Sequence, residues 1–206
     1  MATLIRDPIL EERILAERAA RGADRFDEVW EGVYVMPPMP NDEHQMLVGR
    51  FQRILDEIIG DASLGHVRPG VNVSDRTEAW QQNYRVPDVA VFLNNSSAVN
   101  CDAFWYGGPD LAVEILSPGD QDRDKLPFYA QVKTKEVLIV DRNPWQLELY
   151  RWQAVTKSLQ CVGTSTAASN QTVMCQTVPI GLQLQTGTHR PVILIELRDS
   201  QKTWSI

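Results

Sequence analysis

The order of hydrophobic patterns along the chain predicts an α/β or α+β fold built as a single domain. A long amphipathic helix precedes several strand-sized apolar runs, and the chain beyond residue 143 alternates in short strands. Two of the runs, VPDVAVFL (86–93) and LAVEIL (111–116), are apolar on both faces. That pattern is typical of central strands covered by helices on both sides. At 206 residues the chain is long enough for one well-filled core and short for two.

Composition and charge narrow the class of protein. The chain is 43% hydrophobic and 23% charged, as is ordinary for a soluble globular protein, and its longest apolar runs are too short for a membrane span. Its first 22 residues are too charged for a secretory signal. The three cysteines lack C-x-x-C spacing, which indicates reduced thiols, so we expect a cytoplasmic protein. A net charge of −7 argues against non-specific coating of nucleic acid, but not against metal-assisted cleavage of phosphodiesters.

The first 60 residues predict two helices separated by a strand. Residues 8–22 place apolar side chains at helical spacing among Glu and Arg, which predicts a peripheral amphipathic helix. Val29–Met36 predicts a strand that ends at the prolines 37, 38 and 40. Asn41 or Asp42 can cap the next helix, which continues with an apolar residue every three or four positions and ends at Gly60.

The remainder predicts strands interrupted by one short helix. Three strands are expected at 66–74, 83–93 and 109–117, and a loop (94–108) separates the last two. Residues 117–124 predict a turn, and 124–132 a short helix that tolerates Pro127 only near its first turn. A buried strand at 136–141 follows. Short strands at 146–152, 157–163, 181–186 and 192–197 indicate that the C-terminal region is rich in β-structure.

Two acidic residues, Asp88 and Glu114, stand alone in the apolar runs. Burial of an isolated carboxylate costs several kcal/mol, so each needs a compensating cation. Carboxylates from neighbouring strands can converge, and Mg²⁺ takes one or two of them together with waters and phosphate oxygens. Lys125, at the start of the next helix, can hold or deprotonate an attacking water. The alternative is a structural ion pair in which Lys125 compensates one acid.

Other candidate residues carry weaker signals. His44 opens the long helix and can reach a metal, a phosphate or a water, the alternative being a partly exposed helix-start residue. Asp110 lies about 13 Å along the strand from Glu114, so we expect a strand-start residue and not a metal ligand. No G-x-S-x-G motif and no phosphate-binding G-x-x-x-x-G-K-[ST] loop is present.

Three blocks of sequence resemble a known family. The segments WEGVYVMPPMPNDEHQMLVGRFQRIL (30–55), RVPDVAVFL (85–93) and GGPDLAVEILSPGDQDRDKLPFYAQVKTKEVLIVDRNPWQLELYR (107–151) occur in the order and spacing of the Uma-type endonuclease family. The resemblance implies the restriction-endonuclease-like PD-(D/E)XK fold, a central mixed β-sheet flanked by helices. It covers residues 26–152, with a weaker trace in VPIGLQL (178–184). We expect 1–25 to be a peripheral helix and 153–206 a β-rich extension of the same domain.

The resemblance also implies roles for individual residues. Pro87-Asp88 matches the family's PD, and Glu114 matches the acid of its E-[VI]-L-S-P block. Lys125 and Tyr129 match its K-x-x-x-Y pattern, and His44 matches the histidine that opens the first core helix.

Two departures from the family pattern stand out. Leu116 occupies the usual lysine position of PD-(D/E)XK nucleases, two residues after the acid, so the role must pass to Lys125. Many relatives have G-E-L-V where this chain has Gly32-Val33-Tyr34-Val35, which loses an acid unless Glu31 or Glu43 substitutes.

We therefore predict an endonuclease that depends on Mg²⁺ or Mn²⁺ and hydrolyses phosphodiester bonds of DNA. Asp88 and Glu114 would bind the metal, helped by the Ile115 carbonyl, while Lys125 would orient the water and His44 would contact the scissile phosphate or the metal. A homodimer would suit cleavage of both strands. Arg123, Lys125, Lys133 and Lys135 are expected to form a basic cluster near the site, the alternative being that Lys133 and Lys135 only solvate a helix end.

Two alternatives remain open at this point. The first is a catalytically degenerate nucleic-acid-binding or scaffold protein that retains the fold, which the acidic net charge and Leu116 favour. The second is a metal-dependent hydrolase of a small phosphate ester.

Overall fold

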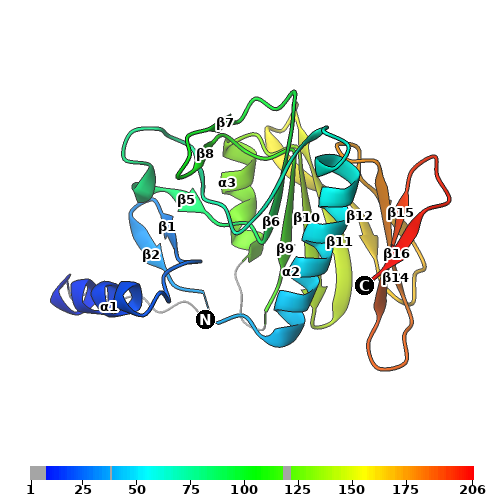
Figure 1. Ribbon diagram of the computed structural model, residues 1–206, viewed down its shortest axis with the longest axis horizontal. Helices are drawn as coiled ribbons and strands as arrows, with labels where there is room; N and C mark the ends of the chain where they lie inside the picture. Colours follow the sequence, from blue (N-terminus) through cyan, green and yellow to red (C-terminus); the bar gives the residue numbers. More distant parts are fainter. Residues whose placement is uncertain (1–7, 38, 118–121) are drawn as a thin grey trace.

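The computed structural model describes residues 8–37, 39–117 and 122–206, which form three β-sheets and three α-helices (Figure 1). The helices are α1 (Pro8–Ala20), α2 (Asp42–Leu55) and α3 (Leu126–Gln131). A π-helical turn, η1 (Asp56–Gly60), extends α2, and a 3₁₀ turn, η3 (Asp122–Lys125), leads into α3. A further 3₁₀ turn is η2 (Trp80–Gln82). Helix α1, drawn in dark blue, projects from the side of the molecule as a peripheral element.

The central sheet has the mixed topology that the sequence predicts. Its strand order is β12-β11-β10-β9-β6-β3, in which β9 and β10 run parallel and the other neighbours run antiparallel. The strands are β3 (Gly65–Pro69), β6 (Val89–Leu93), β9 (Leu111–Ile115), β10 (Glu136–Arg142), β11 (Trp145–Gln153) and β12 (Ser158–Ser165).

Both faces of β6 and β9 are buried, as their residue pattern predicts. Val89 and Val91 pack with Leu47 and Phe51 of α2 on one face. The alternate residues of β6 and β9, together with Phe128 and other residues of α3, form the core on the opposite face. The two-sided burial follows from the topology, since a helix from each neighbouring connection covers one face.

Two smaller sheets flank the central one. Sheet order β2-β1-β5-β4-β8-β7 comprises β1 (Glu28–Trp30), β2 (Val33–Val35), β4 (Val73–Ser74), β5 (Tyr84–Arg85), β7 (Val99–Asn100) and β8 (Trp105–Tyr106). The C-terminal antiparallel sheet comprises β13 (Thr172–Met174), β14 (Ile180–Gln185), β15 (Val192–Leu197) and β16 (Thr203–Ser205). Its apolar side chains join the core on the α2 side, so the extension is packed onto the domain.

Three of the predicted strands are wrong as continuous elements. The predicted strand Val29–Met36 is a hairpin, because Glu31 and Gly32 adopt φ of 47° and 83°, the two left-handed positions of a tight turn. The predicted strand 66–74 divides at Gly70, whose φ is 57°, into β3 and β4 of different sheets. The predicted strand 83–93 divides around Pro87 into β5 and β6.

The predicted helix at 41–60 is confirmed as α2 with η1. The Asn41 side chain accepts a hydrogen bond from the His44 amide at 2.9 Å, which caps the first turn. The short helix at 124–132 is also confirmed, with Pro127 in the first turn of α3. The turn predicted at 117–124 includes residues 118–121, which lie outside the described residues. All three cysteines are free thiols, and none of the described helices is long and apolar enough to span a membrane.

Candidate active site

A lysine that forms ion pairs with two buried glutamates lies beside the end of β9. The ammonium of Lys125 is 2.9 Å from Glu28 Oε1 and 3.4 Å from Glu114 Oε1. Glu28 and Glu114 are 3% and 1% exposed, and Lys125 is 8% exposed. Opposite charges at these distances attract each other strongly where water is excluded.

Tyr129 completes the surroundings of Glu114. Its hydroxyl donates a hydrogen bond to Glu114 Oε1, and its side chain is fully buried. Burial raises the pKa of Tyr129 well above its usual value of 10.0, so the phenol stays protonated and remains a donor. Lys125 and Tyr129 are four residues apart, which brings them to the same face of a helical turn. The K-x-x-x-Y spacing therefore presents two donors to one carboxylate.

Glu28 is the residue that the sequence reasoning missed. It lies in β1, accepts hydrogen bonds from the Val86 amide (2.8 Å) and Trp30 Nε1 (2.7 Å), and reaches Lys125 with Oε1. Glu31 and Glu43, which the sequence offered as substitutes for a lost acid, have other partners. In the sequence, Glu28 is an acid four residues before Gly32 and resembles an exposed residue at the start of a strand. Its burial becomes evident only when β1 pairs with β5.

Asp88 and His44 form the second part of the site. Asp88 directly precedes β6, so the prediction that it lies inside the strand is wrong, and its side chain is 20% exposed. Its Oδ2 accepts a hydrogen bond from the Ile115 amide at 2.8 Å and lies 3.2 Å from His44 Nε2. His44 is buried, and its Nδ1 has no hydrogen-bond partner among the described residues. A buried imidazole nitrogen without a partner is unusual in folded proteins.

The two parts meet at the end of β9 without touching. Asp88 binds the backbone of Ile115, while the side chain of the preceding residue, Glu114, binds Lys125. No described side chain bridges the two carboxylates. The structure thus brings Glu114 and Lys125 together, and separately Asp88 and His44, on adjacent strand ends.

The donor chemistry fits a hard divalent cation. Among the described residues no group of three or more His, Cys, Asp or Glu side chains is arranged around a common point. Mg²⁺, however, takes only one or two carboxylates and completes its shell with water and substrate oxygens. The contacts of Asp88 use Oδ2, so its Oδ1 accepts no hydrogen bond from the part of the chain that the structure describes. Asp88 therefore suits Mg²⁺ or Mn²⁺ as a ligand, whereas both oxygens of Glu114 lie within hydrogen-bonding distance of Lys125.

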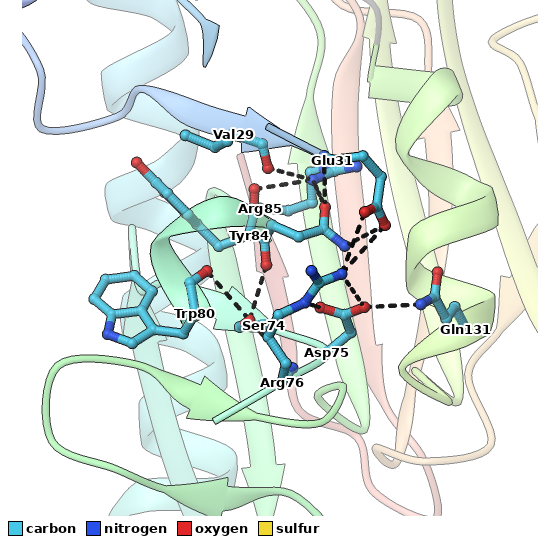
Figure 2. A network of polar contacts seen from close by, with 10 residues as sticks. Val29, Glu31, Ser74, Asp75, Arg76, Trp80, Tyr84, Arg85 and Gln131 are labelled. Atoms are coloured by element: carbon cyan, nitrogen blue, oxygen red, sulfur yellow. Dashed lines mark hydrogen bonds and ion pairs between the residues drawn. The ribbon is translucent and has the colours of Figure 1, made fainter. Parts of the chain in front are cut away.

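A polar network beside the site fixes the β1–β2 hairpin (Figure 2). Asn83 Nδ2 donates to Glu31 Oε1 at 2.8 Å, and Arg76 joins Glu31 to Asp75, which also accepts from Gln131 of α3. The network therefore ties the hairpin that carries Glu28 to the helix that follows Lys125.

Arg85 supports Glu28 through an aromatic ring. Its guanidinium lies 4.5 Å from the Trp30 ring and 4.3 Å from the Phe128 ring, and it donates to the Val29 carbonyl at 2.9 Å. Burial lowers the pKa of Arg85, against which the charge of Glu28 acts. Because Trp30 holds Glu28, this stack fixes the position of the second carboxylate on Lys125.

Comparison with known proteins gives the family. A model of the Uma2 family, described as "Putative restriction endonuclease", matches residues 16–187. The chain belongs to this family. The Uma2 match extends beyond the resemblance expected at 26–152 and includes most of the β-rich extension.

A solved structure supports the same fold for this Uma2 protein. It is described as a "putative nuclease belonging to DUF820 from Anabaena variabilis ATCC 29413". The two structures share 17% sequence identity with a TM-score of 0.57, over 73% of this chain and 82% of that one. At this identity the likeness shows the fold alone, a mixed α/β architecture. None of the curated proteins compared with the chain matches it.

The Uma2 protein departs from the general PD-(D/E)XK pattern at Leu116. Leu116 is 7% exposed and packs in the core on the α3 side. The amine that reaches Glu114 comes instead from Lys125, at the end of η3. Lys125, which directly precedes α3, therefore lies beside Glu114 in place of a lysine at position 116.

The basic cluster expected near the site is largely neutralised. Arg123 pairs with Asp141 at 2.7 Å and with Glu148 at 2.6 Å, and these carboxylates raise the pKa of Arg123 above its ordinary value. Lys135 pairs with Asp110 at 2.5 Å. Nearby carboxylates therefore compensate Arg123 and Lys135.

Proposed function

We propose that the protein is a metal-dependent endonuclease that hydrolyses phosphodiester bonds of DNA. The observation that carries the proposal is the buried Lys125–Glu114 pair beside Asp88 and His44 at the end of β9. The description of the Uma2 family as restriction endonucleases, and that of the similar solved structure as a nuclease, support it. Homodimerisation and a cytoplasmic location stay predictions.

Asp88 and Glu114 would hold Mg²⁺ or Mn²⁺, with the Ile115 carbonyl as a further ligand. A bound metal supplies a Lewis acid for the scissile phosphate and lowers the pKa of a bound water. The other residues act by position and charge. Lys125, flanked by two carboxylates, would orient the attacking water and attract the phosphate. His44, fixed by Asp88 through Nε2, contacts the phosphate or the metal.

A plasmid-nicking assay with Mg²⁺ or Mn²⁺ tests the proposal. The wild type should nick supercoiled DNA, and Lys125→Ala should lose activity by at least about a hundredfold because an electrostatic contact to the reacting phosphate is gone. Lys202→Ala is the matched control, since it removes an exposed lysine paired with Glu57. Cleavage that survives in Lys125→Ala would assign the activity to a contaminant or to another lysine.

Metal binding is tested without turnover. Calorimetric titration with Mn²⁺ should give weaker binding to Asp88→Asn than to the wild type, because a neutral amide replaces a charged ligand. Equal binding by both proteins would refute Asp88 as a metal ligand.

The second candidate is a protein that binds nucleic acid or serves as a scaffold without cleaving it. One observation favours it: Lys125 is already paired with two carboxylates. If the wild type shifts labelled DNA in a gel yet never nicks it with either metal, this second function is the correct one.

A further inference from the structure

We propose that Arg142 is a positioning residue that joins the two parts of the candidate site, and this inference rests on the proposed function. Arg142 ends β10, and its side chain is 6% exposed. Its guanidinium donates to four acceptors in two separate segments. They are the Leu116 carbonyl (2.9 Å), Ser117 Oγ (3.1 Å), Asn41 Oδ1 (3.0 Å) and Glu43 Oε2 (3.0 Å).

The two segments are those that carry the proposed catalytic groups. Leu116 and Ser117 directly follow Glu114 and Ile115 at the end of β9. Asn41 and Glu43 lie in the first turn of α2, next to His44. A planar guanidinium with its fork of donors therefore holds the strand end and the helix start at a set separation.

His44 is the group through which Arg142 acts. Asn41 Oδ1 accepts hydrogen bonds both from Arg142 Nη1 and from the His44 amide, so one oxygen connects the guanidinium to the histidine backbone. The imidazole of His44 then reaches Asp88, and Asp88 accepts from the Ile115 amide. The result is a closed circuit of contacts from β9 through Arg142, α2 and Asp88 back to β9.

A second arginine provides an internal comparison. Arg190, which precedes β15 in the C-terminal extension, approaches Glu43 Oε1 at 3.6 Å with its side chain 30% exposed. It also lies 5.5 Å from the Trp145 ring. Arg190 shares the carboxylate with Arg142 but donates no hydrogen bond to Asn41 or to the end of β9. Loss of Arg190 therefore removes a cation beside Glu43 and leaves the circuit intact.

Activity in the nicking assay is the first test. Arg142→Lys keeps the charge but loses the fork, and Glu43→Gln keeps the shape at a side chain that is 36% exposed. Both should lower kcat about tenfold with KM nearly unchanged, since small displacements of a positioned group are costly. Arg190→Gln should change kcat less than about twofold because its pairing is longer and partly solvated.

A double-mutant cycle separates positioning from structural support. In a His44→Gln background, Arg142→Lys and Glu43→Gln should cause little further loss of kcat, because both act through His44. Losses that multiply in full, as independent structural damage would, overturn the proposal.

A metal-free measurement separates this proposal from the nuclease assignment. The chain has three histidines, so the His44 ring signal in an NMR spectrum is the one missing from His44→Gln. Arg142→Lys and Glu43→Gln should shift that signal. Arg190→Gln and Arg151→Lys should leave the His44 signal unchanged. Arg151→Lys is the matched control, because it also replaces a guanidinium that pairs with a buried acid, Glu136.

The outcomes of the two measurements are distinguishable. A shifted His44 signal in a wild-type background that never cleaves DNA supports the positioning role and refutes the nuclease. An active nuclease whose His44 signal and kcat are unaffected by Arg142→Lys and Glu43→Gln refutes the positioning role and leaves the nuclease standing.

Discussion

Replacement of Lys125 by methionine should destabilise the protein more than loss of a surface lysine. The ammonium of Lys125 compensates Glu28 and Glu114, which are 3% and 1% exposed. Removal of one partner from a buried ion pair costs about 3–5 kcal/mol, because a charge remains in a low-dielectric environment. Methionine fills most of the volume of the lysine stem, so the loss reflects charge and not a cavity. The expected loss is a large share of the roughly 5–15 kcal/mol by which domains are stable.

Urea unfolding followed by tryptophan fluorescence measures this loss, and the chain has six tryptophans. The control is Lys202→Met, since Lys202 and Glu57 are 49% and 34% exposed and such pairs contribute about 0–1 kcal/mol. Adding Glu28→Gln to Lys125→Met should restore about 0.5–3 kcal/mol, because it removes one of the uncompensated charges.

Two results would refute this reasoning. If Lys125→Met loses no more stability than Lys202→Met, the ammonium is solvated and does not compensate the glutamates. If Glu28→Gln lowers the stability of Lys125→Met further, Glu28 acts through its hydrogen bonds to Val86 and Trp30 and not through its charge.

Three further predictions use the same preparation. Tyr129→Phe should lose about 1.5–3 kcal/mol in urea unfolding, because a hydrogen bond to the Glu114 carboxylate disappears without a change of shape, and a loss below about 0.5 kcal/mol would contradict this. Burial raises the pKa of Tyr84 from 10.0 to about 12, so the unfolded chain releases that proton first. The free energy of unfolding should therefore fall as pH rises from about 10 to about 12, and Tyr84→Phe should reduce that fall, whereas an unchanged slope would count against it. Burial also raises the pKa of the Cys175 thiol well above its ordinary value, so a disulfide reagent should modify two thiols in the folded protein and three after unfolding. Rapid modification of all three before unfolding would show that Cys175 is accessible.

Helix α2 shows what local sequence can specify. Its apolar residues recur every three or four positions, Asn41 caps the first turn, and Gly60 ends the π-helical extension, so each feature comes from residues within a turn or two. Strands β6 and β9 were found for a similar reason, since alternation shows which side chains share a face. The division of 66–74 was missed because β3 and β4 pair with different strands further along the chain. The division of 29–36 was missed because the turn at Glu31 and Gly32 was not recognised.

The residues of the candidate site also differ in whether the sequence could predict them. Glu114 and Lys125 were predicted from the sequence, because a lone acid in an apolar strand demands compensation, and Tyr129 came from the family's K-x-x-x-Y pattern. Glu28 and Arg142 were not, since Glu28 contacts Val86 across 58 residues and Arg142 contacts Asn41 across 101. Hydrophobic periodicity reports which face of an element is buried, whereas the partner of a polar side chain depends on how separate elements pack. The sequence therefore determined which charges needed a partner, and only the tertiary structure decided which residues would supply it.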